Sequence, residues 1–95
     1  MMKQPLVVCT KQRGVFFGYG EIPEKDITTI RLERCRMILA WPEAEHGVMN
    51  LANAGPVKGS RVTPPAPTMI LNDVDGIMEM TAEAVTQWEK GVYDE

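Results

Sequence analysis

The sequence predicts a small, mainly β protein of the α+β class, built as a bent antiparallel sheet or partly open barrel of about five strands with two short helices. Short runs rich in β-branched and aromatic residues recur along the chain, and clusters of glycine and proline separate them. Only two stretches combine helical spacing with helix-ending signals. The 95 residues, of which 44% are hydrophobic, fit one domain with a thin core.

The first two strands are expected over residues 5–10 and 15–19. The first is rich in β-branched residues and the second in aromatic ones, and the polar segment 11–14, ending in glycine, is typical of a hairpin connection. Gly18 and Gly20 indicate a bend or a bulge, as a small barrel needs where a strand turns a corner.

A long bent strand follows, or two strands that meet at residues 33–34. Apolar and polar residues alternate over residues 27–32, with a slip at the threonine pair, and the run continues over residues 35–41. Pro42 ends it, because proline cannot donate to a strand ladder. Residues 43–54 then predict a helix of two to three turns, with Gly55 as its C-terminal cap.

The second half of the chain begins with a loop over residues 55–67, which holds two glycines and four prolines and is long enough to suggest a functional role. Residues 68–71 and 77–80 are expected to be strands, with residues 72–76 forming either a tight turn or a bulge in one edge strand. Thr81 is a good N-cap for a last helix over residues 82–90, which Gly91 would follow.

The charge is unevenly distributed. Residues 1–61 hold nine Lys and Arg against six Asp and Glu, which gives +3, whereas residues 62–95 hold one against seven, which gives −6. The acidic total argues against binding extended nucleic acid, although a local basic patch could hold one small anion. A thin core and two complementary halves also predict a homo-oligomer.

Catalytic and metal chemistry have little support in the sequence. Cys9 and Cys35 stand in apolar runs without a nearby partner, so we expect buried, reduced thiols. The single histidine, His46, rules out the usual zinc ligand sets and lies near neither cysteine, so we expect no metal, no cofactor and no enzyme activity. Residues 1–8 hold neither a signal peptide nor a membrane span, which predicts a cytoplasmic protein.

One cluster of residues is a candidate ligand-binding site. Its members are Phe17, Arg36, Trp41, Lys58, Ser60 and Arg61. A guanidinium group binds phosphate through two parallel hydrogen bonds, and an indole or phenyl ring offers a face on which a base can stack. The alternative is structural: Arg36 pairs with a carboxylate of the acidic tail, Trp41 caps the core, and Phe17 belongs to the core.

Several short stretches carry a resemblance to a known family. They are residues 7–10, 14–18, 32–41, 51–52 followed by Gly55, 60–62, 70–71 and 77–81. On these stretches the chain resembles a family of small uncharacterised proteins encoded by tailed bacteriophages and prophages. That family tends to have arginine in place of Cys9, and aromatic residues in place of Leu39 and Ala40. If those positions line a shared site, the site is altered in this chain.

Two functions are compatible with these features. The first is a phage-encoded accessory protein, with counter-defence as one role, that binds and sequesters a small anionic host molecule such as a nucleotide signal. The alternative is a protein-interaction module that inhibits a host enzyme or a defence effector. It would use an exposed strand edge and three methionines, Met69, Met78 and Met80, because methionine suits adaptable surfaces.

Overall fold

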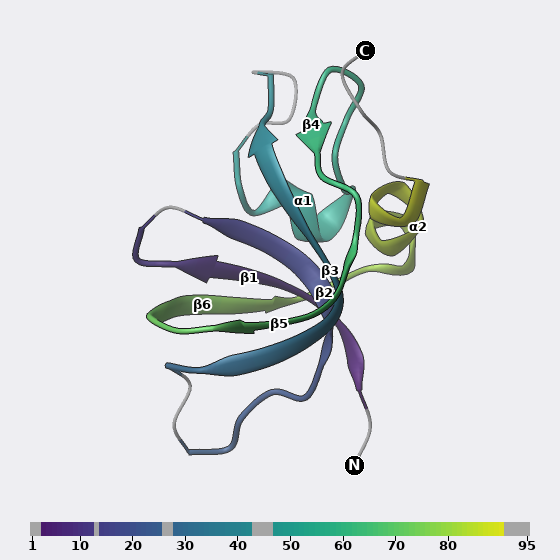
Figure 1. The fold of residues 1–95 in the computed structure, drawn as a ribbon. Helices are drawn as coiled ribbons and strands as arrows, with labels where there is room; N and C mark the ends of the chain where they lie inside the picture. Colours follow the sequence, from purple (N-terminus) through teal and green to yellow (C-terminus); the bar gives the residue numbers. More distant parts are fainter. Residues whose placement is uncertain (1–2, 13, 26–27, 43–46, 91–95) are drawn as a thin grey trace.

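The chain folds into one bent antiparallel sheet with two short helices on one of its faces (Figure 1). The computed structural model describes residues 3–12, 14–25, 28–42 and 47–90. The elements in chain order are β1 (Gln4–Thr10), β2 (Val15–Gly20), β3 (Ile30–Ala40), α1 (Asn50–Asn53), β4 (Arg61–Val62), β5 (Ala66–Leu71), β6 (Val74–Glu79) and α2 (Ala82–Lys90). The mainly β fold class predicted from the sequence is confirmed.

The long strand β3 organises the sheet. The strands are ordered β4-β3-β2-β1-β6, and β5 pairs with the first half of β3 on the same edge that β4 occupies further along. The expected bend lies at Arg34, whose φ of 52° is in the left-handed region. Between the pairs Tyr19↔Glu33 and Phe17↔Arg36, β3 has one residue more than β2. The strand is therefore continuous but bulged.

Both faces of the sheet are buried, each in its own apolar cluster. The sheet curls around one cluster, to which five of its strands contribute: Leu6, Val8, Phe16, Ile30, Leu32, Cys35, Leu71 and Val74. The helices cover the other cluster, which consists of Val7, Val15, Phe17, Ile38, Leu51, Ala52, Val62 and Trp88. Burial on both faces explains why β1 has a continuous apolar run instead of a strict alternation.

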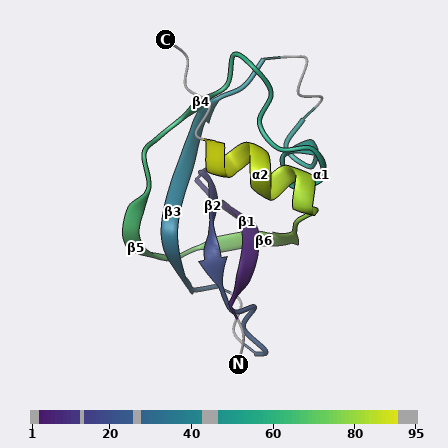
Figure 2. The same cartoon turned by 90° about the vertical axis from the view of Figure 1, so that its right-hand side faces the viewer.

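A sharp corner at Asn72 and Asp73 brings the two edges of the sheet together. β5 pairs with β3 and β6 pairs with β1, and within the described residues no ladder joins β5 to β6. Backbone hydrogen bonds fix the corner, from the Lys11 amide to the Asp73 carbonyl at 2.9 Å and from the Val74 amide to the Thr28 carbonyl at 3.0 Å. From this corner the two strands diverge (Figure 2), which leaves an open sheet and not a closed barrel.

The segment 72–76 contains both a turn and a bulge, which the sequence left open as alternatives. Asn72 and Asp73 form the turn, and Asp73 has a φ of 55°, which aspartate tolerates better than most residues. In β6, Gly76 pairs with Cys9 while Val74 pairs with Thr10, so that the intervening residue is extra and forms a bulge.

Two predicted elements differ from the structure. Residues 43–46 of the expected helix 43–54 lie outside the described residues, and of the remainder only Asn50–Asn53 is helical. Gly47 has a φ of 101°, which no right-handed helix can contain. The predicted loop 55–67 contains the two-residue strand β4, so the sheet has six strands. Ile27, the expected start of β3, is likewise outside the described part.

Helix α2 lies where the sequence predicts it, and it holds α1 in place. The Thr81 hydroxyl accepts a hydrogen bond from the Ala84 amide at 3.1 Å, as an N-cap does, and donates to the Asn53 carbonyl at 2.6 Å. The Trp88 indole N–H donates to the Leu51 carbonyl at 3.0 Å. Neither described helix has the length and apolar character needed to cross a membrane.

We expect Trp88→Ala to destabilise the fold by about 3–5 kcal/mol, because it empties a fully buried site and leaves a carbonyl of α1 without its donor. Trp41→Ala is the matched control. Its indole is 36% exposed, and we expect a loss below about 1 kcal/mol. Urea unfolding followed by circular dichroism measures both changes, and equal losses would contradict the described packing.

Candidate functional site

The second half of β3 and the short strand β4 form an arm that extends beyond the rest of the sheet, at the top of Figure 1. We define the arm as residues 37–41 and 61–63. Its two strands pair at Ile38↔Val62 and Ala40↔Arg61. The Thr63 amide donates to the Met37 carbonyl at 2.9 Å, and the Met37 amide donates to the Thr63 hydroxyl at 3.0 Å.

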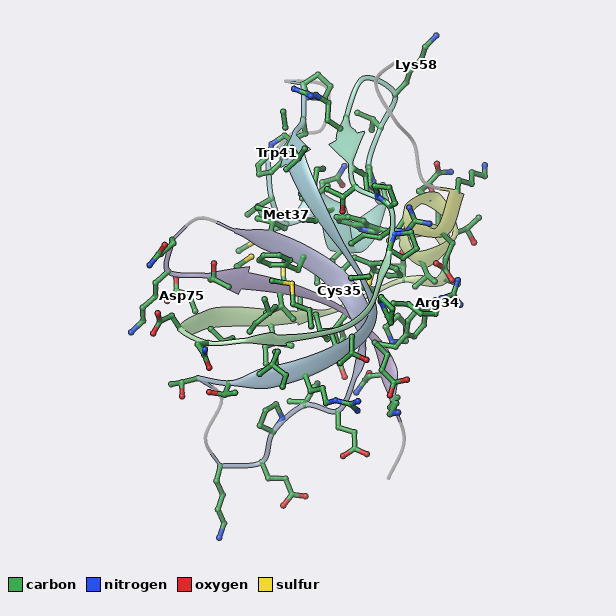
Figure 3. The ribbon with its side chains drawn as sticks, viewed as in Figure 1. Arg34, Cys35, Met37, Trp41, Lys58 and Asp75 are labelled. Carbon is green, nitrogen blue, oxygen red and sulfur yellow. The ribbon has the colours of Figure 1, made fainter. Side chains whose placement is uncertain are left out.

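One face of the arm is covered by the helices and the opposite face is exposed. Ile38 and Val62 are buried against the helices, so alternation places Met37 on the opposite face. A register shift between Ile38 and Ala40 interrupts the alternation beyond that point, where Leu39 and Trp41 are exposed. Leu39 is 53% exposed and Trp41 36%. Figure 3 shows Met37 and Trp41 along the same side of β3.

Arg61 completes this exposed surface. It neighbours the buried Val62 in β4 and is itself exposed, so within β4 it lies on the face opposite Val62, and it pairs with Ala40 across the register shift in β3. We call the surface formed by Met37, Leu39, Trp41 and Arg61 the arm face. The sequence analysis selected Trp41 and Arg61 but missed Leu39, although apolar residues at 37, 39 and 41 of one strand were a signal that could have identified it.

The other predicted site residues do not reach the arm face. Arg36 is 7% exposed and lies on the helix-covered side, where its Nη1 donates to the Thr63 carbonyl at 3.3 Å. Phe17 is fully buried, with its ring stacked on Trp88 at 5.2 Å between centroids. A ring in that position offers no free face to a ligand.

The two remaining candidates, Lys58 and Ser60, lie in the loop before β4 and outside the arm face. Ser60 is fully buried, and its hydroxyl has no hydrogen-bond partner among the described residues. Lys58 is exposed and points away from Trp41 (Figure 3). Of the six predicted residues, only Trp41 and Arg61 are exposed on the arm.

The edge of β5 is a second exposed surface. Residues 66–70 are exposed, and the apolar side chains of Met69 and Ile70 are 39% and 60% exposed. Of the three methionines predicted to form an interaction surface, only Met69 contributes, because Met78 and Met80 pack against the helix-side cluster. A hollow of about 250 Å³ lies beside this edge, lined by Thr10, Gln12, Phe16, Met69, Ile70, Leu71, Asn72 and Asp73.

A second hollow, of about 340 Å³, lies near the start of β3, and the charged side chains that line it are paired with one another. Its lining includes Lys3, Arg31 and Glu33. Glu33 forms ion pairs with both cations, and its pKa is lowered, chiefly by the hydrogen bond from Lys3. Because both cations already share a carboxylate, this hollow is a weak candidate for binding an anion.

A polar cluster at the bulge of β3 connects the sheet to α2. The Tyr19 hydroxyl donates to Glu89 at 2.8 Å, and the Arg34 guanidinium lies 3.6 Å from the same carboxylate and over the Tyr19 ring. Burial raises the pKa of Tyr19 to about 12, and the hydrogen bond to Glu89 and its charge add to the shift. Tyr19, Arg34 and Glu89 thus have their hydrogen-bond and ion-pair partners within the cluster, which favours a structural role for it.

The cysteines are poor candidates for chemistry. Both are free, Cys35 inside the curled side of the sheet and Cys9 on the helix side. Burial raises the pKa of both thiols, to about 11 for Cys35, so they stay protonated and weakly nucleophilic at neutral pH. Among the described residues, no three His, Cys, Asp or Glu side chains gather to hold a metal ion. His46 lies outside these residues.

Comparison with known proteins identifies a family. Residues 3–88 match the family described as a domain of unknown function (DUF6948), and the chain belongs to that family. No curated protein and no solved structure matches the chain. The family brings no activity with it, so a functional proposal depends on the surfaces described above.

The Tyr19 cluster should make the fold sensitive to alkali. Tyrosine ionises near pH 10 in the unfolded chain but near 12 in the folded protein, so the unfolded state releases its proton first. We expect the free energy of unfolding to fall as the pH rises from about 10 to 12. Urea unfolding at a series of pH values measures this, and Tyr19→Phe should remove part of the slope. An unchanged slope in that variant would contradict the assignment.

Proposed function

We propose that the chain is a protein-interaction module that contacts its partner through the arm face. The observation that carries the proposal is the exposure of Leu39 and Trp41, 53% and 36%, on an arm that also carries the exposed Arg61. The resemblance to bacteriophage proteins adds a host enzyme or a defence effector as the class of partner.

The composition of the arm face supports this function. Tryptophan and arginine are the residue types most enriched among those that dominate binding energies at protein interfaces. Covering Leu39 and Trp41 would contribute on the order of 1–2 kcal/mol each, because both still expose apolar surface to water. The cationic Arg61 suits a carboxylate on the partner surface.

The arm face is also held in a fixed shape before any partner binds. Thr63 and Met37 exchange two hydrogen bonds across the arm, and Ile38 and Val62 anchor it to the helix-side cluster. A preformed surface loses less conformational entropy on binding than a flexible one, which favours a stable complex.

A second candidate function is the sequestration of a small anionic molecule such as a nucleotide at the same face. The exposed indole of Trp41 next to the guanidinium of Arg61 favours it, because the two groups could stack on a base and bind a phosphate. We place it second because Arg36 lies on the opposite side of β3, and because Leu39 extends the apolar surface beyond what a small anion needs.

Capture from a bacterial host lysate tests the first proposal. We expect the wild-type chain to retain a stoichiometric partner, and Leu39→Asp or Trp41→Ala to weaken its binding at least about tenfold, as loss of a central interface residue does. Met49→Asp is the matched control, since Met49 is 73% exposed and outside the arm face. If Leu39→Asp and Met49→Asp retain the partner equally well, the arm face is not the contact surface.

Isothermal titration with mononucleotides and cyclic nucleotides tests the second candidate. Binding should produce heat with at least one of them, and both Arg61→Ala and Trp41→Ala should weaken it about tenfold or more. The absence of heat with the whole panel, or an affinity that neither variant changes, would rule out a nucleotide at the arm face.

A further inference from the structure

We propose that two copies of the chain associate through their β5 strands, which pair edge to edge in an antiparallel manner and extend the sheet across a twofold axis. This dimer goes beyond the proposed function and uses a different surface. The β5 edge and the arm face can therefore be tested separately.

The edge of β5 is open to a second strand. β5 pairs only with β3, and residues 66–70 are exposed although they belong to a strand. In Figure 2, β5 forms the left margin of the molecule, and no other described element lies beyond it. An edge of this kind carries backbone groups that a further strand can use for pairing.

The two free edges of the sheet differ in how they are protected. β6 holds two exposed acidic residues, Asp75 and Glu79, and charges on an edge strand oppose the addition of another strand. β5, with the sequence APTMIL, holds no charged residue, and Pro67 is the one residue in it that opposes the pairing of a further strand. Residues 68–70 are therefore an unprotected stretch that includes two exposed apolar side chains.

The absence of charge is what makes a second copy a suitable partner. In a twofold antiparallel pair, each residue faces an equivalent position of the same strand, so a charged strand would place like charges opposite each other. β5 avoids this repulsion completely. A twofold axis at Met69 would place Met69 opposite its counterpart and Thr68 of each copy opposite Ile70 of the other.

The contact is short, so the dimer should be reversible. Three to five residues on each side bury less than the roughly 1,000 Å² that a stable interface needs, unless neighbouring surface contributes. We expect association that depends on protein concentration.

Sedimentation equilibrium over a wide range of protein concentrations tests the proposal. The wild-type mass should rise from one copy to two, and Ile70→Lys should raise the dissociation constant at least about tenfold, because it places two like charges in the paired edge. Met49→Lys is the matched control, since Met49 is more exposed than Ile70 and lies outside β5. It should dimerise like the wild type.

Disulfide trapping tests the orientation. With the axis at Met69, the Met69→Cys variant should cross-link to itself, whereas Thr68→Cys should cross-link to Ile70→Cys in a mixture more readily than to itself. A monomer at every concentration, or a dimer that Ile70→Lys leaves unchanged, would overturn the proposal. A monomer that instead binds an extended peptide at Ile70 would also overturn it, and would show a foreign strand as the occupant. None of these results would contradict the arm face as a contact surface.

Discussion

The stacking of Trp88 on Phe17 is the contact on which the arrangement of the molecule depends. The two rings lie 5.2 Å apart at an interplanar angle of 10°, and both are fully buried. The same indole donates to the Leu51 carbonyl, so one side chain joins α2, α1 and the sheet. Because this contact places both helices on one side of the sheet, the opposite side of the arm has no cover, and Leu39 and Trp41 stay exposed there.

The bulge at Arg34 decides which residues share that uncovered side. Leu32 points to the curled side of the sheet, and regular alternation would send Arg36 to the same side. The extra residue reverses the alternation, so that Cys35 and Met37 point to the curled side and Arg36 to the helices. A single inserted residue thus separates Arg36 from Arg61, and with it the two guanidinium groups that the sequence analysis expected to find together.

The sequence predicts this fold best where local signals are strong. Thr81 as an N-cap and the apolar spacing after it locate α2, and the β-branched run of β1 locates the first strand. The sequence predicts poorly those elements whose geometry depends on contacts between residues that are distant in the chain. The two-residue strand β4 exists only because β3 offers it an edge, and α1 is reduced to one turn beyond Gly47. Membership of the candidate site depends on which face of β3 a side chain lies on and on whether it is exposed. The bulge at Arg34 and the helices decide both properties. Residue type alone could therefore suggest only Trp41 and Arg61.

The two proposed surfaces are related through β3, because β4 and β5 occupy successive parts of the same edge. In an antiparallel β5 pair the two β3 strands also run in opposite directions, so the two arms lie at opposite ends of the joined sheet. Strand pairing within one continuous sheet keeps equivalent side chains on the same surface. The two arm faces would therefore point to the same side of the dimer, and a partner with two matching sites could be held by both. Binding at the first face would raise the effective concentration of the second, so that a weak edge contact could strengthen binding at the arms without any new contact.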